Sequence, residues 1–408
     1  MRTDAIRAGC AATVVAICLL IAPTVAVVAA ASPASAPREV HAFFYLWYGV
    51  PEVDGRYLHW NHEILQHWTP SIAAQWPKGK FEPPGDVGAT FMPARGLYSS
   101  NDPATLRSQM NEARAAGIDV IVASWWPANR PDGQGVDTDR CVPALLDAAK
   151  AAGIRVAFHI EPYTDRTPQT VRGDLEYLAT HYGSHPAVHR FPRPSTGQLL
   201  PIVYVYDSYI NPASEWAEIL SPTGTNTIRG TPLDHVVIGL FLHADSRSFL
   251  RAGHFDGSYS YFAASGSSYG STPANWNRIA RDAEEDGMLF IPSVGPGYDD
   301  TRIRPWNGGN KRPREAGKYY ERMWDAAKQI SSSVGSRFGN IVSITSLNEW
   351  GEGTQIEAAK AFTTEKGEKL EEYTDGPEMY MQLTSKFAAV FKQLPAHTQQ
   401  SEETHGEL

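Results

Sequence analysis

Residues 341–357, with the sequence IVSITSLNEWGEGTQIE, contain the pattern on which both the fold and the chemistry depend. The first seven residues are rich in β-branched side chains and alternate apolar with hydroxyl groups, which is typical of a strand. The strand then meets Asn348-Glu349-Trp350-Gly351-Glu352-Gly353, where two carboxylates lie three residues apart beside an indole. One carboxyl can donate a proton, the other can assist a nucleophile, and the indole can stack on a sugar. A polar loop with two solvated acids is the alternative interpretation.

Seven further strand-like segments precede this stretch, and helical patterns separate many of them. Several of these helical patterns begin at Pro and end before Gly, which is the expected helix punctuation. Eight strands alternating with helices predict a single (β/α)8 TIM barrel of the α/β class with extended βα loops, and a doubly wound open sheet is the alternative. The expected strands are 41–47, 119–126, 155–161, 201–207, 235–243, 257–263, 288–294 and 341–349, and the expected helices are 102–116, 142–152, 168–182, 273–285, 316–333 and 373–394.

Most of the expected strands end in aromatic or acidic residues. The carboxyl ends of barrel strands form one face, which is where the active sites of such barrels lie. Separate strands therefore bring Glu161, Asp207, Glu349, Glu352 and many aromatic rings to one rim. A core-capping ring or a helix-capping carboxylate could explain any single strand end. Seven such ends together predict a catalytic or sugar-binding rim.

Residues 1–36 have the features of a signal peptide or a signal anchor with a short stem. Arg2 and Arg7 precede an uncharged apolar run that is long enough to span a bilayer, and Ala29-Ala30-Ala31 offers small residues for cleavage. Cleavage would give a secreted protein, whereas retention would leave the body in the lumen. Residues 37–395 are the expected catalytic domain, and residues 396–408 are a polar C-terminal tail.

Charge and cysteine content limit the partners and the disulfide bonds that this protein can have. The formal net charge of −9 argues against nucleic acid or an anionic membrane surface as a partner, so any membrane contact is expected only through the N-terminal segment. Cys10 and Cys18 lie in the apolar run and leave Cys141 alone in the body, so no intrachain disulfide is expected in the mature domain.

Two groups of histidines lie close enough in the sequence to be considered as metal ligands. His59 and His62 form a close pair, and His181, His185 and His189 recur every four residues. Neither group carries a carboxylate in the usual catalytic metal pattern, and Gly183 and Pro186 interrupt the second group. The sequence therefore predicts no catalytic metal and no other cofactor.

Motifs along the whole body resemble glycoside hydrolase family 99, which contains Golgi endo-α-1,2-mannosidases and related bacterial endo-mannanases. The resemblance covers about residues 40–392 and implies a (β/α)8 fold, no metal and retention of anomeric configuration. The motifs that carry it are WYG-P with DG and HWNH (47–62), FHIEPY (158–163), YVYDSY (204–209), FDG-Y-YF (255–262), IPSVGPGYDDT-IRPWN (291–307) and ITSLNEW-EGTQIE (344–357).

The resemblance also implies a mechanism for the closing motif, with Glu349 and Glu352 as the catalytic pair. The better match makes Glu349 the general acid/base that protonates the leaving oxygen and later activates water. The base that deprotonates the mannose 2-hydroxyl is then Glu352 or Glu161. Deprotonation lets that oxygen attack the anomeric carbon and form a 1,2-anhydro sugar, so the substrate replaces an enzyme nucleophile.

The same resemblance nominates residues for substrate binding. In Golgi members of the family the second aromatic of the 125–126 pair is typically Tyr, whereas this chain has Trp126, as bacterial mannan-cleaving members do. The loop 128–139 borders that position and could restore recognition of glucose. The nominated residues are Tyr45, Trp125, Trp126, Glu161, Asp207, Tyr209, Tyr261, Tyr269, Asn348 and Trp350.

Three functions follow as hypotheses. The first is a luminal endo-α-1,2-mannosidase that trims glucosylated high-mannose N-glycans and releases glucosyl-mannose, held in the Golgi as a single-pass type II protein. The second is the same chemistry on mannan-type polysaccharide by a secreted enzyme. The third is a catalytically silent glycan-binding barrel, which the presence of both carboxylates disfavours.

Overall fold

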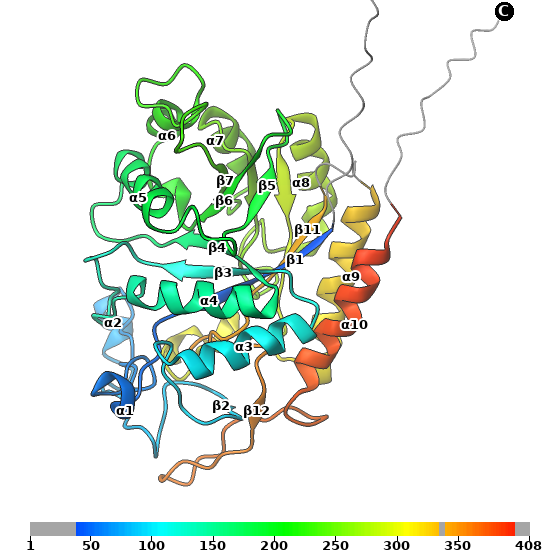
Figure 1. Cartoon of the computed structure of the whole chain (residues 1–408). Helices are drawn as coiled ribbons and strands as arrows, with labels where there is room; N and C mark the ends of the chain where they lie inside the picture. Colours follow the sequence, from blue (N-terminus) through cyan, green and yellow to red (C-terminus); the bar gives the residue numbers. More distant parts are fainter. Residues whose placement is uncertain (1–37, 334–338, 396–408) are drawn as a thin grey trace, which may run out of the picture. The chain divides into compact units, whose positions relative to one another are not determined.

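Eight parallel strands close into a ring in the computed structural model, which describes residues 38–333 and 339–395 (Figure 1). Hydrogen-bonded neighbours follow the order β10-β11-β1-β3-β4-β6-β7-β8-β9. Only Pro292 separates β9 from β10, so these segments act as one strand that pairs with β8 and β11. The expected barrel is confirmed, and the open-sheet alternative is wrong. The ring contains β1 (Glu39–Tyr45), β3 (Val120–Trp125), β4 (Arg155–Ile160), β6 (Leu199–Val205), β7 (Val236–Leu240), β8 (Gly257–Tyr259), β9 (Leu289–Ile291), β10 (Ser293–Val294) and β11 (Ile341–Ile344).

Helices cover the outside of the ring (Figure 1). Five of the six expected helices lie within two residues of their expected bounds. The sixth, α10, begins at Met379 instead of residue 373, because Gly376 has a φ of 92° and Pro377 lacks an N–H. Two short helices, α6 and α7, were not expected. The helices around the ring are α3 (Pro103–Ala115), α4 (Val142–Ala152), α5 (Pro168–His181), α6 (Ala213–Leu220), α7 (Ser246–Ala252), α8 (Pro273–Glu285), α9 (Lys318–Ser333) and α10 (Met379–Gln393).

The remaining elements lie in the connections. Antiparallel pairing joins β5 (Arg190–Pro192) to β6 and β2 (Met92–Pro93) to β12 (Ala359–Lys360). The short helices are α1 (Pro51–Asp54), α2 (Pro70–Ala73), η1 (Asp139–Cys141), η2 (Ser208–Ile210), η3 (Pro305–Asn310) and η4 (Glu315–Gly317).

Aromatic rings fill the barrel interior. The ring centroid of Phe43 on β1 lies 4.8 Å from that of His159 on β4, 5.7 Å from that of Tyr204 on β6 and 5.6 Å from that of Tyr259 on β8. All four side chains are buried. Because side chains alternate across a strand, this interior layer directs residues two positions further along each strand towards the rim.

None of the described helices is both long and apolar enough to cross a membrane. The predicted signal or anchor segment and the polar tail lie outside the described residues.

Candidate active site

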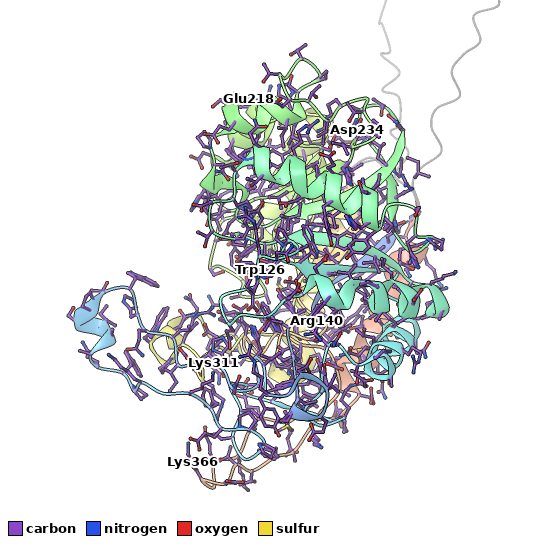
Figure 2. The ribbon with its side chains drawn as sticks, turned by 60° about the vertical axis from the view of Figure 1, so that its left-hand side comes forward. Trp126, Arg140, Glu218, Asp234, Lys311 and Lys366 are labelled. Carbon is purple, nitrogen blue, oxygen red and sulfur yellow. The ribbon has the colours of Figure 1, made fainter. Side chains whose placement is uncertain are left out.

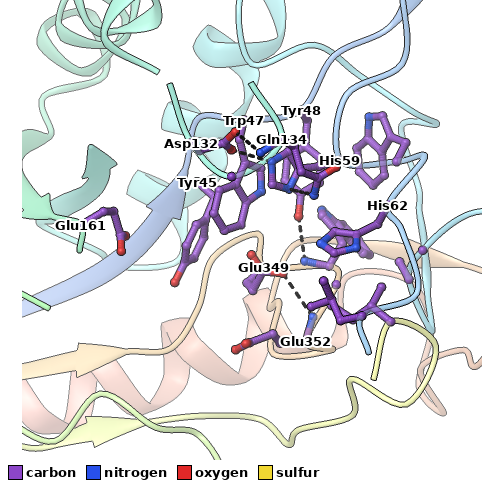
Figure 3. Close-up of a pocket in the computed structure, with 18 of the residues that line it drawn as sticks. Tyr45, Trp47, Tyr48, His59, His62, Asp132, Gln134, Glu161, Glu349 and Glu352 are labelled. Atoms are coloured by element: carbon purple, nitrogen blue, oxygen red, sulfur yellow. Dashed lines mark hydrogen bonds and ion pairs between the residues drawn. The ribbon is translucent and has the colours of Figure 1, made fainter. Parts of the chain in front are cut away.

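A pocket opens at the carboxyl ends of the strands, where the sequence predicts the functional rim (Figure 3). Its lining comes from the segments that follow β1, β3, β4, β6, β8 and β11, with further residues from the 59–65, 88–89, 132–134 and 303–304 segments. The lining residues are Tyr45, Trp47, Tyr48, His59, Trp60, His62, Leu65, Gly88, Ala89, Trp126, Asp132, Gly133, Gln134, Glu161, Tyr206, Tyr261, Ile303, Arg304, Glu349, Trp350, Gly351 and Glu352.

The two carboxylates of the closing motif enter this pocket from a compact loop. The strand β11 ends at Ile344, five residues before the expected end, because the chain folds back on itself: Ser346 N–H donates to Thr354 O at 2.9 Å and Ile356 N–H donates to Ser346 O at 3.0 Å. Glu349 N–H also donates to Ser346 Oγ at 2.8 Å. This loop turns the Glu349 side chain into the barrel mouth.

Glu349 and Glu352 are linked directly. The backbone N–H of Glu352 donates to Glu349 Oε1 at 3.1 Å (Figure 3), whereas Glu349 Oε2 is buried and has no hydrogen-bond partner among the described residues. Burial, together with the nearby charge of Glu352, raises the pKa of Glu349 well above its ordinary value. An unpaired, buried carboxyl oxygen of this kind favours a bound proton.

Glu352 has a different environment. Burial raises its pKa too, but Arg304 opposes the rise: Arg304 Nη1 donates to Glu352 Oε1 at 3.0 Å and to Asp300 Oδ2 at 3.0 Å. The Glu352 side chain is 24% exposed, so it lies nearer to solvent than Glu349. Because the two carboxyls interact, they titrate as a pair. The pKa values of both are raised, so the pair still holds one proton at a pH where ordinary carboxyl groups are fully ionised.

Gly351 is required by the close packing of this pair. A Cβ at this position would lie 2.9 Å from Glu349 Oε1 and 3.3 Å from Ile303 Cδ1. We expect Gly351→Ala to lower kcat about tenfold to a hundredfold, because the Glu349 carboxyl must move by several tenths of an ångström. Gly308→Ala is the matched control, since a Cβ there meets nothing within 4 Å. Equal kcat in the two variants, both with wild-type melting temperatures, would contradict this role.

Glu161 faces the pair from another side of the pocket (Figure 3). Ser124 Oγ donates to Glu161 Oε1 at 2.7 Å, and His159 Nδ1 lies 3.2 Å from the same oxygen. No residue of the described ranges bonds to the other oxygen, Oε2, which can therefore accept from a sugar hydroxyl. Asp207 and Tyr209, predicted in support, do not line this pocket; they lie at the start of η2, and Tyr209 is 41% exposed.

The tryptophan pair after β3 divides between two environments. Trp126 lines the pocket, and its buried Nε1–H has no hydrogen-bond partner among the described residues. Trp125 points the opposite way, is fully buried, and donates from Nε1 to Asp139 Oδ1 at 2.8 Å. Trp125, nominated for substrate binding, therefore lies outside the pocket, because adjacent strand residues face opposite sides of the sheet.

Tyr45 and Tyr261 line the pocket with their hydroxyls hydrogen-bonded to each other. Asn348 is fully buried and holds the Tyr45 backbone, accepting from its N–H at 2.7 Å and donating to its carbonyl at 3.0 Å. Asn348 therefore positions Tyr45 instead of lining the pocket. Trp350 does line it, whereas Tyr269, also predicted, packs against Phe241 outside this pocket.

Several pocket residues escaped the sequence analysis. The His59 ring stacks on Trp47 at 4.3 Å, and His59 Nε2 is 2.6 Å from Asp132 Oδ2. The buried Nε1–H of Trp47 has no hydrogen-bond partner in the described part of the chain. The HWNH motif contains His59, but its spacing from His62 indicates only a possible metal pair and not a contact with Trp47 or Asp132. Arg304, in the IRPWN motif, carried no signal that tied it to Glu352.

One cluster of metal-ligand type occurs among the described residues, away from the pocket. Glu39, His41 and His189 lie at the opposite end of the barrel, around the start of β1. Glu39 Oε2 is 3.1 Å from His41 Nε2 and 2.9 Å from His189 Nε2, so the three groups satisfy one another by hydrogen bonds. The partner of His189 is thus Glu39, which the spacing of His189 from His185 in the sequence did not predict.

Comparison with known proteins agrees with this geometry. The sequence model of glycosyl hydrolase family 99 matches residues 36–393. The chain belongs to glycosyl hydrolase family 99. It is therefore a glycoside hydrolase, as the motifs implied.

Proteins similar to this chain come from animals and bacteria. Glycoprotein endo-alpha-1,2-mannosidase of Mus musculus is 44% identical over 352 residues, covering 86% of this chain and 74% of the mouse protein. The glycoprotein endo-alpha-1,2-mannosidase-like protein of Homo sapiens is 44% identical, covering 86% of this chain and 76% of the human protein. The structure of the GH99 endo-alpha-mannosidase from Bacteroides thetaiotaomicron superposes with a TM-score of 0.78 at 37% identity, covering 87% of this chain and 97% of that chain.

Proposed function

We propose that this family 99 enzyme is a retaining endo-α-1,2-mannosidase that cleaves internal α-1,2-mannosidic bonds of glucosylated high-mannose N-glycans and releases glucosyl-mannose. The observation that carries the proposal is the hydrogen-bonded Glu349–Glu352 pair at the carboxyl end of the barrel, in which Glu349 is buried. The names of the similar mouse and human proteins, both glycoprotein endo-alpha-1,2-mannosidases or like them, support the choice of bond and glycan.

The pair supports substrate-assisted catalysis through a single shared proton. One carboxylate accepts the proton of the mannose 2-hydroxyl while the other carboxyl protonates the leaving oxygen. O2 then attacks C1 as the glycosidic bond breaks, which gives a 1,2-anhydro sugar and the free glycan. In the second step water attacks C1 and gives a proton to the former acid, while the former base returns its proton to O2. Two inversions at C1 give retention, and the pair holds one proton before and after each step.

The polar groups left unsatisfied in the pocket suit a sugar. The indole N–H groups of Trp47 and Trp126 and the Oε2 atom of Glu349 are buried without hydrogen-bond partners among the described residues. Buried polar groups are costly unless paired, and hydroxyls can both donate and accept. Sugar hydroxyls can therefore satisfy all three atoms, while the rings of Tyr45 and Trp126 pack against the carbohydrate faces.

The second candidate is a secreted endo-α-1,2-mannanase, and Trp126 is the residue that favours it. Its indole occupies the pocket wall where the resemblance implies Tyr in Golgi members, and Asp132 and Gln134 from the adjacent loop line the same pocket. The N-terminal segment separates the two candidates by location. We assign the protein to the secretory pathway, with retention in the Golgi lumen by residues 1–36 as a type II anchor and secretion after cleavage as the alternative.

The test uses purified protein mixed with glucosylated and non-glucosylated high-mannose glycans. Mass spectrometry identifies the released sugar. We expect glucosyl-mannose to be released in clear preference to a mannose disaccharide. Preferential release of the mannose disaccharide would establish the mannanase candidate instead. Glycan binding without any turnover would leave the silent binding barrel.

A further inference from the structure

An exposed aromatic cluster stands beside the active-site pocket. Trp68 is 78% exposed. The ring of His67 stacks on it at 4.0 Å, and Trp306 contacts it edge-to-face at 5.1 Å. We call His67, Trp68 and Trp306 the Trp68 cluster. One face of the Trp68 indole is thus fixed by neighbouring rings while much of its surface remains open to solvent.

The Trp68 cluster is joined to the pocket wall by hydrogen bonds. Trp306 Nε1–H donates to Leu65 O at 2.9 Å, and Leu65 N–H donates to Ile303 O at 2.7 Å. Leu65 and Ile303 both line the pocket, as does Arg304, two residues before Trp306. The cluster therefore continues the pocket wall that carries Arg304, the residue whose guanidinium group contacts Glu352.

The segment that carries Trp68 projects from the body of the molecule. Figure 2 shows α2, in light blue at the left, at the end of this projecting segment. No residue of α2 is buried. Because Trp68 and the helix that follows it bury so little surface, the stability of the barrel gives no reason for a large apolar ring at this position.

The pocket is too small for a whole high-mannose glycan. Its cavity volume is about 340 Å³, near the lower end of the range of about 300–1,000 Å³ for pockets that hold one small ligand. An endo-acting enzyme must therefore leave further sugar units of its substrate outside the pocket. A fixed indole face matches the apolar C–H face of a pyranose ring, and an uncharged platform suits an uncharged ligand.

We propose that Trp68 is a stacking platform for sugar units of the N-glycan that lie outside the pocket. The proposal rests on the proposed function and extends it by a binding site on the rim. Trp306 and His67 hold the indole in place, so little conformational entropy is lost when a sugar stacks on it.

The test compares a long substrate with a short one. The variants are Trp68→Ala, Trp68→Phe and, as a matched control on the same projecting segment, Trp76→Ala, whose ring is 38% exposed outside the Trp68 cluster. The long substrate is a complete high-mannose glycan, and the short one is a disaccharide fluoride that fills only the sites before the scissile bond. For Trp68→Ala we expect KM for the glycan to rise about tenfold with kcat unchanged, and both constants for the short substrate to stay at wild-type values.

Three outcomes separate the possibilities. Trp68→Phe should recover most of the loss, because a ring remains, and Trp76→Ala should behave as wild type. An unchanged KM for the glycan in Trp68→Ala, or an equal rise in Trp76→Ala, would overturn the platform while leaving the proposed function intact. If the wild-type protein cleaves neither substrate, the proposed function itself fails, and the platform proposal fails with it.

Discussion

Glu349→Gln and Glu352→Gln should each lower kcat on the high-mannose glycan about 10²-fold to 10⁴-fold, the range for loss of a general acid or base. An amide neither carries the transferable proton nor accepts one from the 2-hydroxyl. KM should change little, because the lost interaction belongs to the transition state. Steady-state kinetics on a labelled glycan would measure both constants.

The control for this prediction is Glu357→Gln. Glu357, the last residue of the closing motif, is also buried, but it accepts hydrogen bonds from Arg95 and Tyr98 and does not line the pocket. The Glu357→Gln variant should therefore lose stability more than catalytic activity. The two variants are compared at equal folded fraction. If Glu349→Gln loses no more activity than Glu357→Gln, the loss comes from changing a buried carboxyl and not from the loss of proton transfer.

Arg304→Met should move the acidic limb of the kcat/KM profile to higher pH and lower activity at neutral pH about tenfold to a hundredfold. Burial raises the pKa of both carboxyls, and Arg304 lowers it. Removing Arg304 should therefore raise the pKa of the pair further above its ordinary value. Catalysis needs one proton on the pair. As pH falls a second proton binds, and in the variant this happens at a higher pH.

Arg304→Lys provides the matched comparison, since it keeps a positive charge near Glu352. We expect its acidic limb to stay close to that of the wild type. The limb is measured from kcat/KM over the range in which all variants remain folded. An unshifted limb in Arg304→Met would mean that the Arg304–Glu352 contact only supports the loop.

The sequence predicted the barrel and the position of Glu349 and Glu352 at its mouth because both depend on local patterns. Strand–helix alternation identified seven of the eight ring strands as single segments, and Pro292 divided the remaining one. Glu349 and Glu352 were found because the strand, the glycines and the spacing of the acids are contiguous. The loop that turns Glu349 inward, by contrast, depends on hydrogen bonds between Ser346 and Thr354 that spacing alone does not reveal.

The errors arose where the direction of a side chain or a distant contact decided the outcome. Adjacent residues Trp125 and Trp126 share one motif, yet only the phase of β3 determines which of them faces the pocket. His59 meets Asp132 from 73 residues away in the sequence. Arg304 meets Glu352 across 48 residues. Long loops brought these pairs together, and loop conformation follows from tertiary contacts that no local pattern encodes.

The most direct test of the shared-proton mechanism measures Glu349→Gln and Glu352→Gln on a disaccharide fluoride, whose leaving group needs no protonation. The mechanism predicts that one variant, the one that lacks the general acid, recovers most of the wild-type rate, while the variant that lacks the base stays inactive. The recovered variant identifies the acid. Equal loss of activity in both variants would contradict the division of the pair into an acid and a base.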